Sequence, residues 1–244
     1  MISAVCFAEP VTAQETFPLS PYQAEYRVLR GGKPIGLVHV HLSRRDDGLW
    51  NYRIESEATA WYVRLLGVST TESSWFDWHD GRIVPLTYHH VSREPGRDRY
   101  WQHRYQWEEG ISDTRTHSGE FKIDLIPGLL DPLTLRLDAI LTVAAQDPEF
   151  ADFERQVLER DTIETQEYRY VEPEQIELDD RCFDTRVYRR FRREGSSRNY
   201  LAWHARELDW LPVRIAHRDD GTPIELELTE LRSTDYALPE PGDC

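Results

Sequence analysis

The chain has 244 residues, with 29 Lys and Arg against 44 Asp and Glu, and its formal net charge is −15. This balance excludes a nucleic-acid binder held by bulk charge, because neutralising phosphates requires a cationic face. Hydrophobic residues make up 39% of the chain and aromatic residues 11%, which excludes an intrinsically disordered protein and predicts a folded core.

The N-terminal residues 1–16 are interpreted as a leader. The apolar stretch 2–8 precedes Val11-Thr12-Ala13, a small-residue pattern typical of a secretory cleavage site. The stretch is short and no positive charge precedes it, so two alternatives remain: a signal peptide truncated at an incorrect start, or a disordered tail. We favour the truncated signal peptide, and with it a periplasmic location. No segment reaches the roughly 18 consecutive apolar residues that suggest a transmembrane helix.

After the leader, apolar and polar residues alternate, which predicts half-buried β-strands. In the first strand, Tyr22, Ala24, Tyr26 and Val28 share one face. The predicted strands of the first half, separated by short polar turns, are 22–28, 35–43, 50–56, 70–78, 83–92 and 99–107. Such a series of hairpins predicts an antiparallel sheet large enough to curl into a barrel or half-barrel.

The period changes in the middle of the chain. Asp131-Pro132 is typical of a helix N-cap followed by a first-turn proline, and the apolar residues after it recur at helical spacing as far as Ala144. Asp147-Pro148 is interpreted as a second helix start. The apolar stripe expected on this second helix comprises Phe150, Phe153, Val157 and Leu158. The strands expected after the helices are 164–171, 182–193, 199–204, 211–218 and 224–231.

These elements predict a mainly β fold, with a large curved antiparallel sheet and one or two central helices. We expect a single β-rich domain over 17–232 and a flexible C-terminal tail over 233–244. Cleavage near Ala13 would remove Cys6 and leave Cys182 and Cys244. In an oxidising compartment these two cysteines can pair and close a long loop, or Cys182 can remain a buried thiol. The sequence leaves both alternatives open.

The sequence contains no pattern that assigns a catalytic or metal-binding role to a particular residue. His39 and His41 share a strand face and can reach one metal ion, but His89-His90 points to opposite faces and nothing selects a third ligand. The third-ligand candidates are His103, His117 or a carboxylate. The chain has no His-Glu-x-x-His, Cys-x-x-Cys or Gly-x-Ser-x-Gly pattern and no phosphate-binding loop. Polar strand faces explain the histidines more simply, so we assign no catalytic, metal-binding or cofactor-binding residue and predict no cofactor.

Three further features have a structural and a functional interpretation. Asp131 is the most distinctive carboxylate, and helix capping explains it. The aromatic run 75–78, with Trp101 and Trp107, suits core packing better than a sugar-stacking or lipid-facing surface. The arginine-rich segment 189–193 suits surface ion-pair networks, with a head-group or anion site as the alternative.

A set of strand and turn patterns runs through the chain: Tyr22-Gln23-Ala24-Glu25-Tyr26, Ile35-Gly36, Leu130-Asp131-Pro132-Leu133, Phe183-Asp184-Thr185-Arg186-Val187, Tyr200-Leu201-Ala202-Trp203, Leu211-Pro212-Val213-Arg214-Ile215 and 222–231. In these segments the chain resembles an exported bacterial family catalogued as domain of unknown function 3108. The resemblance extends over about residues 20–232 and consists of strand and turn patterns. It implies a β-rich protein in the periplasm or envelope, and it carries no catalytic residues.

Three functions follow as hypotheses. The first is a non-enzymatic envelope protein whose concave sheet binds a lipid, lipoprotein or glycan. The second is a hydrolase or modifying enzyme of envelope polymers, which requires convergent polar groups in a cleft. The third is a scaffold partner of envelope machinery, which requires an exposed apolar patch. The acidic surface should repel anionic membranes, so a lipid role would depend on an enclosed cavity or on the 189–193 segment. The sequence does not indicate an oligomeric state.

Overall fold

The structure, a computed structural model, describes residues 16–60, 67–191, 199–218, 221–242 and 244, without the side chains of 97, 199 and 218. The described strands are β1 (Tyr22–Arg30), β2 (Lys33–Arg44), β3 (Trp50–Ala58), β4 (Ser69–His79), β5 (Arg82–Glu94), β6 (Arg97–Gln106), β7 (Ile111–Thr116), β8 (Gly119–Asp124), β9 (Phe153–Glu159), β10 (Thr162–Leu178), β11 (Arg181–Phe191), β12 (Asn199–Ala205), β13 (Leu211–Arg218) and β14 (Ile224–Ser233). The described helices are α2 (Thr134–Ala145) and a short 3-10 helix, η1 (Arg206–Leu208).

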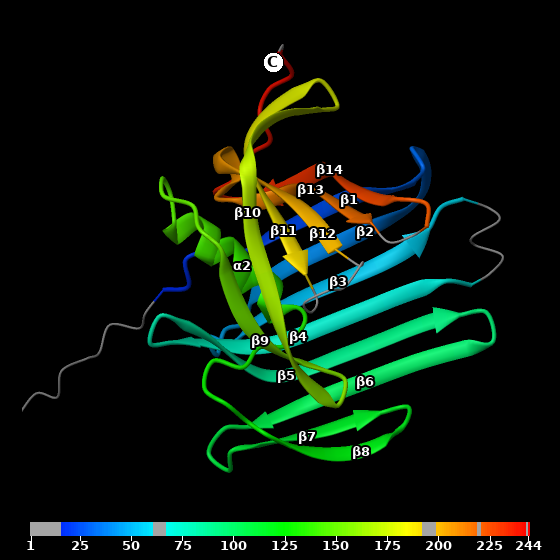
Figure 1. The fold of residues 1–244 in the computed structure, drawn as a ribbon, viewed down its shortest axis with the longest axis vertical. Helices are drawn as coiled ribbons and strands as arrows, with labels where there is room; N and C mark the ends of the chain where they lie inside the picture. The colour runs from blue at the N-terminus through cyan, green and yellow to red at the C-terminus, as the bar shows by residue number, and fades with distance from the viewer. Residues whose placement is uncertain (1–15, 61–66, 192–198, 219–220, 243) are drawn as a thin grey trace, which may run out of the picture.

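All the described strands belong to one antiparallel sheet. The described residues form a 14-stranded sheet in the order β8-β7-β6-β5-β4-β3-β2-β1-β14-β13-β12-β11-β10-β9. Two meanders, β1–β8 and β9–β14, are therefore joined where the first strand pairs with the last (Figure 1). The segment between β8 and β9 carries α2 from one edge of the sheet to the other. This arrangement confirms the predicted large curved antiparallel sheet.

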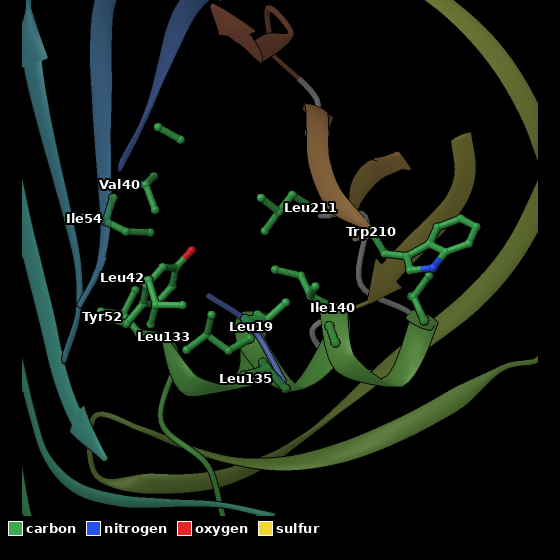
Figure 2. Packing of buried hydrophobic residues seen from close by; sticks show 14 of the residues in the cluster. Leu19, Val40, Leu42, Tyr52, Ile54, Leu133, Leu135, Ile140, Trp210 and Leu211 are labelled. Carbon is green, nitrogen blue, oxygen red and sulfur yellow. The ribbon is translucent and has the colours of Figure 1, made fainter. Parts of the chain in front are cut away.

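Helix α2 lies inside the curve of the sheet and supplies much of the core. Leu133, which precedes the helix, and Leu137 are fully buried, as is Val143 near its C-terminal end. Figure 2 shows Leu133 and Ile140 among side chains of the surrounding strands. The labelled residues on β2 and β3 are Val40, Leu42, Tyr52 and Ile54, and the same buried cluster contains them all. Enclosing the helix allows the inward face of the sheet to exclude water, which is the main source of stability.

The predicted strand faces are confirmed. Tyr22, Ala24 and Tyr26 are buried, and Val28 packs against the same core. On β2 the buried side chains are Val38, Val40 and Leu42, while the histidines between them are only half-buried. Alternation in the sequence therefore identified the inward face of these strands correctly.

The second predicted helix is wrong. Phe153, Val157 and Leu158 lie on strand β9, which pairs with β10. Val157 and Leu158 are consecutive and both buried, Val157 in the main core and Leu158 in a second cluster with Tyr105 and Leu129. Burial of both faces of this strand produced an apolar spacing that resembles that of a helix. Strands β7 and β8 lie in a segment for which no strand was predicted.

The C-terminal residues expected to form a flexible tail are fastened to the β10–β11 hairpin. Cys182 and Cys244 form a disulfide that spans 62 residues, with their Cα atoms 5.3 Å apart. Nearby, the Gly242 N–H donates to the Asp180 carbonyl at 2.8 Å. Figure 1 shows this end of the chain beside the projecting hairpin. Cys6 and the rest of the proposed leader before residue 16 lie outside the described residues.

Gly36 on β2 permits a close approach to β3, and this provides a test of the sheet packing. A Cβ at Gly36 would lie 2.5 Å from the Glu57 carbonyl oxygen, so Gly36→Ala should lower the free energy of unfolding by about 1–3 kcal/mol. Gly242→Ala is the matched control, because the nearest atom to its added Cβ lies 4.0 Å away. Urea unfolding measures both variants. An equal midpoint for Gly36→Ala and the unmodified protein would contradict the prediction.

Among the described residues, no helix combines the length and the apolar character needed to cross a membrane.

Candidate functional site

A cavity lies between α2 and the concave face of the sheet. It has two compartments: a polar one of about 170 Å³ beside the first turn of α2, and an apolar one of about 250 Å³ beside the middle of the helix. Arg136, Arg190 and Tyr200 line both compartments. The two compartments therefore meet at these three side chains, two of which are cationic.

The apolar compartment is lined by aliphatic side chains and tyrosines from both halves of the sheet. Its aliphatic wall comprises Val38, Val40, Ile54, Ala139, Ile140, Ala202, Ile215 and Leu226. Its tyrosines are Tyr26, Tyr52, Tyr168, Tyr188 and Tyr200. Among the described residues, no Asp or Glu lines this compartment. Its charge therefore comes from Arg136 and Arg190, and it suits a mainly apolar molecule with few polar groups.

The polar compartment is built around Glu72 on β4. Cross-strand register places Glu72 directly opposite His90 on β5, and His90 opposite Trp101 on β6. The Tyr88 hydroxyl donates to Glu72 Oε2 at 2.7 Å, and His90 Nδ1 lies 3.7 Å from the same oxygen. Arg136 on α2 approaches from the other side, with Nη2 3.6 Å from Glu72 Oε1. Helix and sheet thus share one buried carboxylate.

The charge of Glu72 is fixed by these neighbours. Burial raises the pKa of its carboxyl, but Arg136, His90 and Tyr88 outweigh that effect and hold the pKa at about 2, below the ordinary 4.5. A carboxylate with this pKa stays ionised at neutral pH and is a weak base. Glu72 is therefore an anchor for the Arg136 guanidinium and is poorly suited to general acid–base catalysis.

Asp131 is buried and caps the start of α2, as the sequence predicted. Its Oδ1 accepts from the backbone N–H groups of Leu133 at 2.8 Å and Thr134 at 2.9 Å. Its Oδ2 accepts from the Ser74 hydroxyl at 2.6 Å, which attaches the helix start to β4. Burial raises the pKa of Asp131 to about 6 despite these hydrogen bonds. Helix α2 itself begins at Thr134, three residues after the capping carboxylate.

Two further histidines are buried in the sheet. His103 is 1% exposed and His204 is 4% exposed. Burial lowers the pKa of His103 to about 3 and that of His204 to about 4. Both imidazoles are therefore neutral at pH 7, and His204 lines the apolar compartment.

The histidine pair considered for a metal does not form a site. His39 lies beside two carboxylates on the outer face, with Nδ1 3.6 Å from Glu25 and Nε2 3.8 Å from Glu57. Within the described ranges, no group of three or more His, Cys, Asp or Glu side chains is placed to hold a metal ion. As expected, His89 and His90 point to opposite faces, and only His90 reaches the interior.

The aromatic run and the arginine-rich segment are each divided between the two faces of the sheet. Phe76 is fully buried, whereas Trp75 is half-buried with the Arg45 guanidinium 5.3 Å from its ring centroid. Arg189 is exposed, whereas its neighbour Arg190 lines the cavity. Residues 192 and 193 of that segment lie outside the described residues. Core packing accounts for much of the aromatic run, and the arginine-rich segment supplies one residue to the candidate site.

Sequence reasoning did not identify Glu72 or Arg136, although each carried a signal. Glu72 has the same parity as the buried Ser74 and Phe76, so its carboxylate occupies an inward position of a strand. Arg136 lies between the buried Leu135 and Leu137 on a short, largely buried helix. A charge at a core-facing position requires a partner, and this is the signal to search for.

Comparisons with known proteins support the fold. No family model and no curated protein matches the chain. A solved structure does match: the "Beta-barrel-like Protein of Domain of Unknown Function DUF1849 from Brucella abortus", with a TM-score of 0.58 at 10% sequence identity, covering 89% of this chain and 99% of that chain. At this identity the likeness shows the fold alone. This chain therefore has a β-barrel-like fold, and the resemblance to domain of unknown function 3108 stays a prediction.

Proposed function

We propose that this chain is a non-enzymatic binding protein of the bacterial cell envelope that holds a small lipid-like molecule between α2 and the concave sheet. The observation that carries the proposal is the apolar compartment of about 250 Å³, which the helix and strands of both meanders line. A close-packed core leaves few voids larger than a water molecule, so an apolar space of this size beside a buried helix is a feature to be explained. A bound apolar molecule explains it.

The size and lining of the compartment narrow the class of ligand. Pockets for drug-sized molecules occupy roughly 300–1,000 Å³, so a compartment of about 250 Å³ suits one chain or ring system. A lipoprotein anchor with several acyl chains is too large for it. A glycan requires many hydrogen-bonding partners for its hydroxyl groups, whereas aliphatic side chains and tyrosine rings dominate this wall. We therefore place a single-chain lipid ahead of the lipoprotein and the glycan.

The two alternative functions have less support. The hydrolase hypothesis requires a general acid or base, and the buried Glu72 is held ionised with a pKa of about 2. The scaffold hypothesis requires an exposed apolar patch. The exposed large hydrophobic residues in the described part of the chain are Val91, Tyr100 and Val171. Val91 and Tyr100 are opposite each other on β5 and β6, which makes a small pair and not an extended surface.

Export to the periplasm is part of the proposal. The disulfide between Cys182 and Cys244 supports it, because such bonds persist in oxidising compartments and are rare in the cytosol. The family resemblance supports the same location. Alkylation of free thiols in cell fractions, followed by mass measurement, tests this part. A chain found in the cytosolic fraction with both thiols free would contradict it.

Binding of an uncharged apolar probe tests the cavity directly. N-phenyl-1-naphthylamine should bind saturably, at one molecule per chain, with enhanced fluorescence. Ala202 lines the apolar compartment, and Ala202→Phe fills part of it, so the affinity for the probe should fall about tenfold or more.

Val91→Phe is the matched control, because Val91 is 43% exposed and outside the cavity. It should bind the probe as the unmodified protein does. Thermal unfolding of all three proteins checks that each is folded. Non-saturable binding, or equal affinity of the Ala202→Phe variant, would overturn the proposal.

A further inference from the structure

We infer that the ligand of this cavity is a single-chain amphiphile with an anionic oxygen head group, whose head lies between Arg136 and Arg190 and whose chain fills the apolar compartment. This inference rests on the proposed function and adds the chemistry of the head group and its place. It depends on the charge, pairing and position of the two arginines.

The first observation is the sign of the charge in the apolar compartment. The chain carries 44 acidic residues and a net charge of −15, yet among the described residues no Asp or Glu lines the apolar compartment, while two arginines do. The carboxylates among the described lining residues, Glu72 and Glu159, belong to the polar compartment. The two guanidinium groups therefore make the potential positive where the two compartments meet the apolar wall. An anion is favoured there and a cation is disfavoured.

The second observation is that the described residues leave both arginines with unused hydrogen-bonding capacity. Arg136 has one carboxylate neighbour among the described residues, Glu72, and the N···O distance of 3.6 Å is longer than a hydrogen bond. Its side chain is 39% accessible although α2 lies inside the curve of the sheet, because it opens onto the cavity. Guanidinium groups carry five donors in a fixed fork that matches a carboxylate or phosphate.

Among the described residues, Arg190 has fewer carboxylate neighbours than Arg136. Its guanidinium lies 4.4 Å from the Tyr200 ring centroid and beside the Tyr168 hydroxyl, and neither neighbour is a carboxylate. In the described part of the chain, no carboxylate oxygen forms an ion pair with Arg190, for which an N···O distance of 4.0 Å or less is required. A buried or half-buried cation is costly without a counter-charge, so a ligand oxyanion would stabilise it.

The third observation is a further polar group beside the same ring. His217 stacks on Tyr200 with ring centroids 4.5 Å apart, and it lines the apolar compartment. Its Nε2 is buried and has no hydrogen-bond partner within the described residues. Buried polar atoms are nearly always paired in native proteins, so this atom also indicates a missing ligand group.

The position of the arginines determines the orientation of the ligand. Both line the boundary between the polar and the apolar compartments, so a head group there leaves the wall of Val40, Ile54 and Ile140 to the chain. A free inorganic anion would leave that wall empty. The geometry therefore points to a molecule that has both an anionic head group and an apolar chain.

The experiment compares four ligands that share a twelve-carbon chain: dodecanoate, dodecyl phosphate, dodecanol and dodecyltrimethylammonium. Each competes with N-phenyl-1-naphthylamine below its micelle concentration. The two anions should bind about 10- to 100-fold more tightly than the alcohol, because charge-assisted hydrogen bonds to arginine are the stronger kind. The cation should bind most weakly. Acetate and inorganic phosphate should not displace the probe.

The variants locate the head group. Arg190→Gln and Arg136→Gln should each reduce the ratio of anion affinity to dodecanol affinity about tenfold. Arg189→Gln is the matched control, since Arg189 is the exposed neighbour on the same strand. Arg136→Gln removes the counter-charge of Glu72 and can impair folding. The double variant Glu72→Gln/Arg136→Gln avoids an unpaired buried carboxylate, and Arg190→Gln leaves this pair intact, so each of these two variants tests the head-group position by itself.

The outcomes separate this inference from the proposed function. Equal affinities for dodecanoate and dodecanol, with saturable probe binding, would overturn the inference and leave the apolar binding function intact. An anion preference that survives both arginine substitutions would overturn the placement of the head. Displacement of the probe by acetate or phosphate alone would indicate a free-anion site and also overturn it. Failure of the probe itself to bind would overturn the function and the inference together.

Discussion

Acidification from about pH 7 to about pH 4 is expected to lower the free energy of unfolding by about 5 kcal/mol through four buried groups. Burial holds the pKa of His103 at about 3 and that of His204 at about 4, below the ordinary 6.5. Below pH 6.5 the two histidines become protonated in the unfolded chain but stay neutral in the folded protein. Their contribution to the free energy of unfolding is therefore fully present above pH 6.5 and is lost as the pH falls. Each histidine contributes about 3 kcal/mol to the loss at pH 4.

The two buried carboxylates act in opposite directions over the same range. The pKa of Asp131 is raised to about 6, so on acidification the folded state takes up a proton before the unfolded state does. Acidification to pH 4 therefore raises the free energy of unfolding by about 2 kcal/mol through this group. The pKa of Glu72 is lowered to about 2, so its contribution is lost below pH 4.5, by about 1 kcal/mol at pH 4. The histidines therefore dominate, and the net loss is a large part of a typical stability of roughly 5–15 kcal/mol.

Urea unfolding at the two pH values measures this effect. His103→Gln and His204→Gln should each reduce the pH-dependent change by about 3 kcal/mol, whatever they cost at pH 7. His79→Gln is the control, because it removes an imidazole whose side chain is 73% exposed. If both buried-site variants kept the full pH dependence of the unmodified protein, the acid sensitivity would have another origin.

Loss of the disulfide is expected to have an effect of similar size. Cys182→Ser/Cys244→Ser should lower the free energy of unfolding by about 4 kcal/mol, because the bond closes a loop of 62 residues in the unfolded chain. That loop contains β11–β14, and β14 is the partner of β1. The backbone hydrogen bond from Gly242 to Asp180 is worth only about 1 kcal/mol and cannot replace the bond.

Denaturant midpoints of the oxidised protein, the reduced protein and the double variant provide the measurement. The reduced protein and the double variant should agree with each other and fall below the oxidised protein. The double variant also serves as the control for reductant, because reductant should leave its midpoint unchanged. A midpoint that reductant leaves unchanged would contradict the prediction.

The sequence was most informative where inward-facing positions are apolar. Alternation predicted the strands of the first meander because residues such as Tyr22 and Val38 face the core. It did not reveal β7, because the inward side chains of that strand are Ser112, Thr114 and Thr116, which are buried and polar. It misassigned β9 because that strand packs two neighbouring apolar residues into two different clusters.

The candidate site was hidden for a different reason. Its ionisable side chains come from elements far apart in the sequence, and the fold brings them together: Glu72, His90, Arg136, Glu159 and Arg190. No local spacing encodes that register. His90 was noted beforehand only as a weak metal-ligand candidate. Arg190 was noted as part of an arginine-rich segment, and only the fold distinguishes it from the exposed Arg189.

The pairing of the first strand with the last determines when this sheet can be completed. Arg30 pairs with Ile224 and Tyr22 with Ser233, so β1 keeps one open edge until nearly the whole chain has been made. Contacts of such sequence separation form slowly, because the loop-closure entropy is lost before the contact is gained. An N-terminal fragment would expose unpaired backbone along β1 and invite association with other strands. The sheet can therefore close only after synthesis of the chain is almost complete.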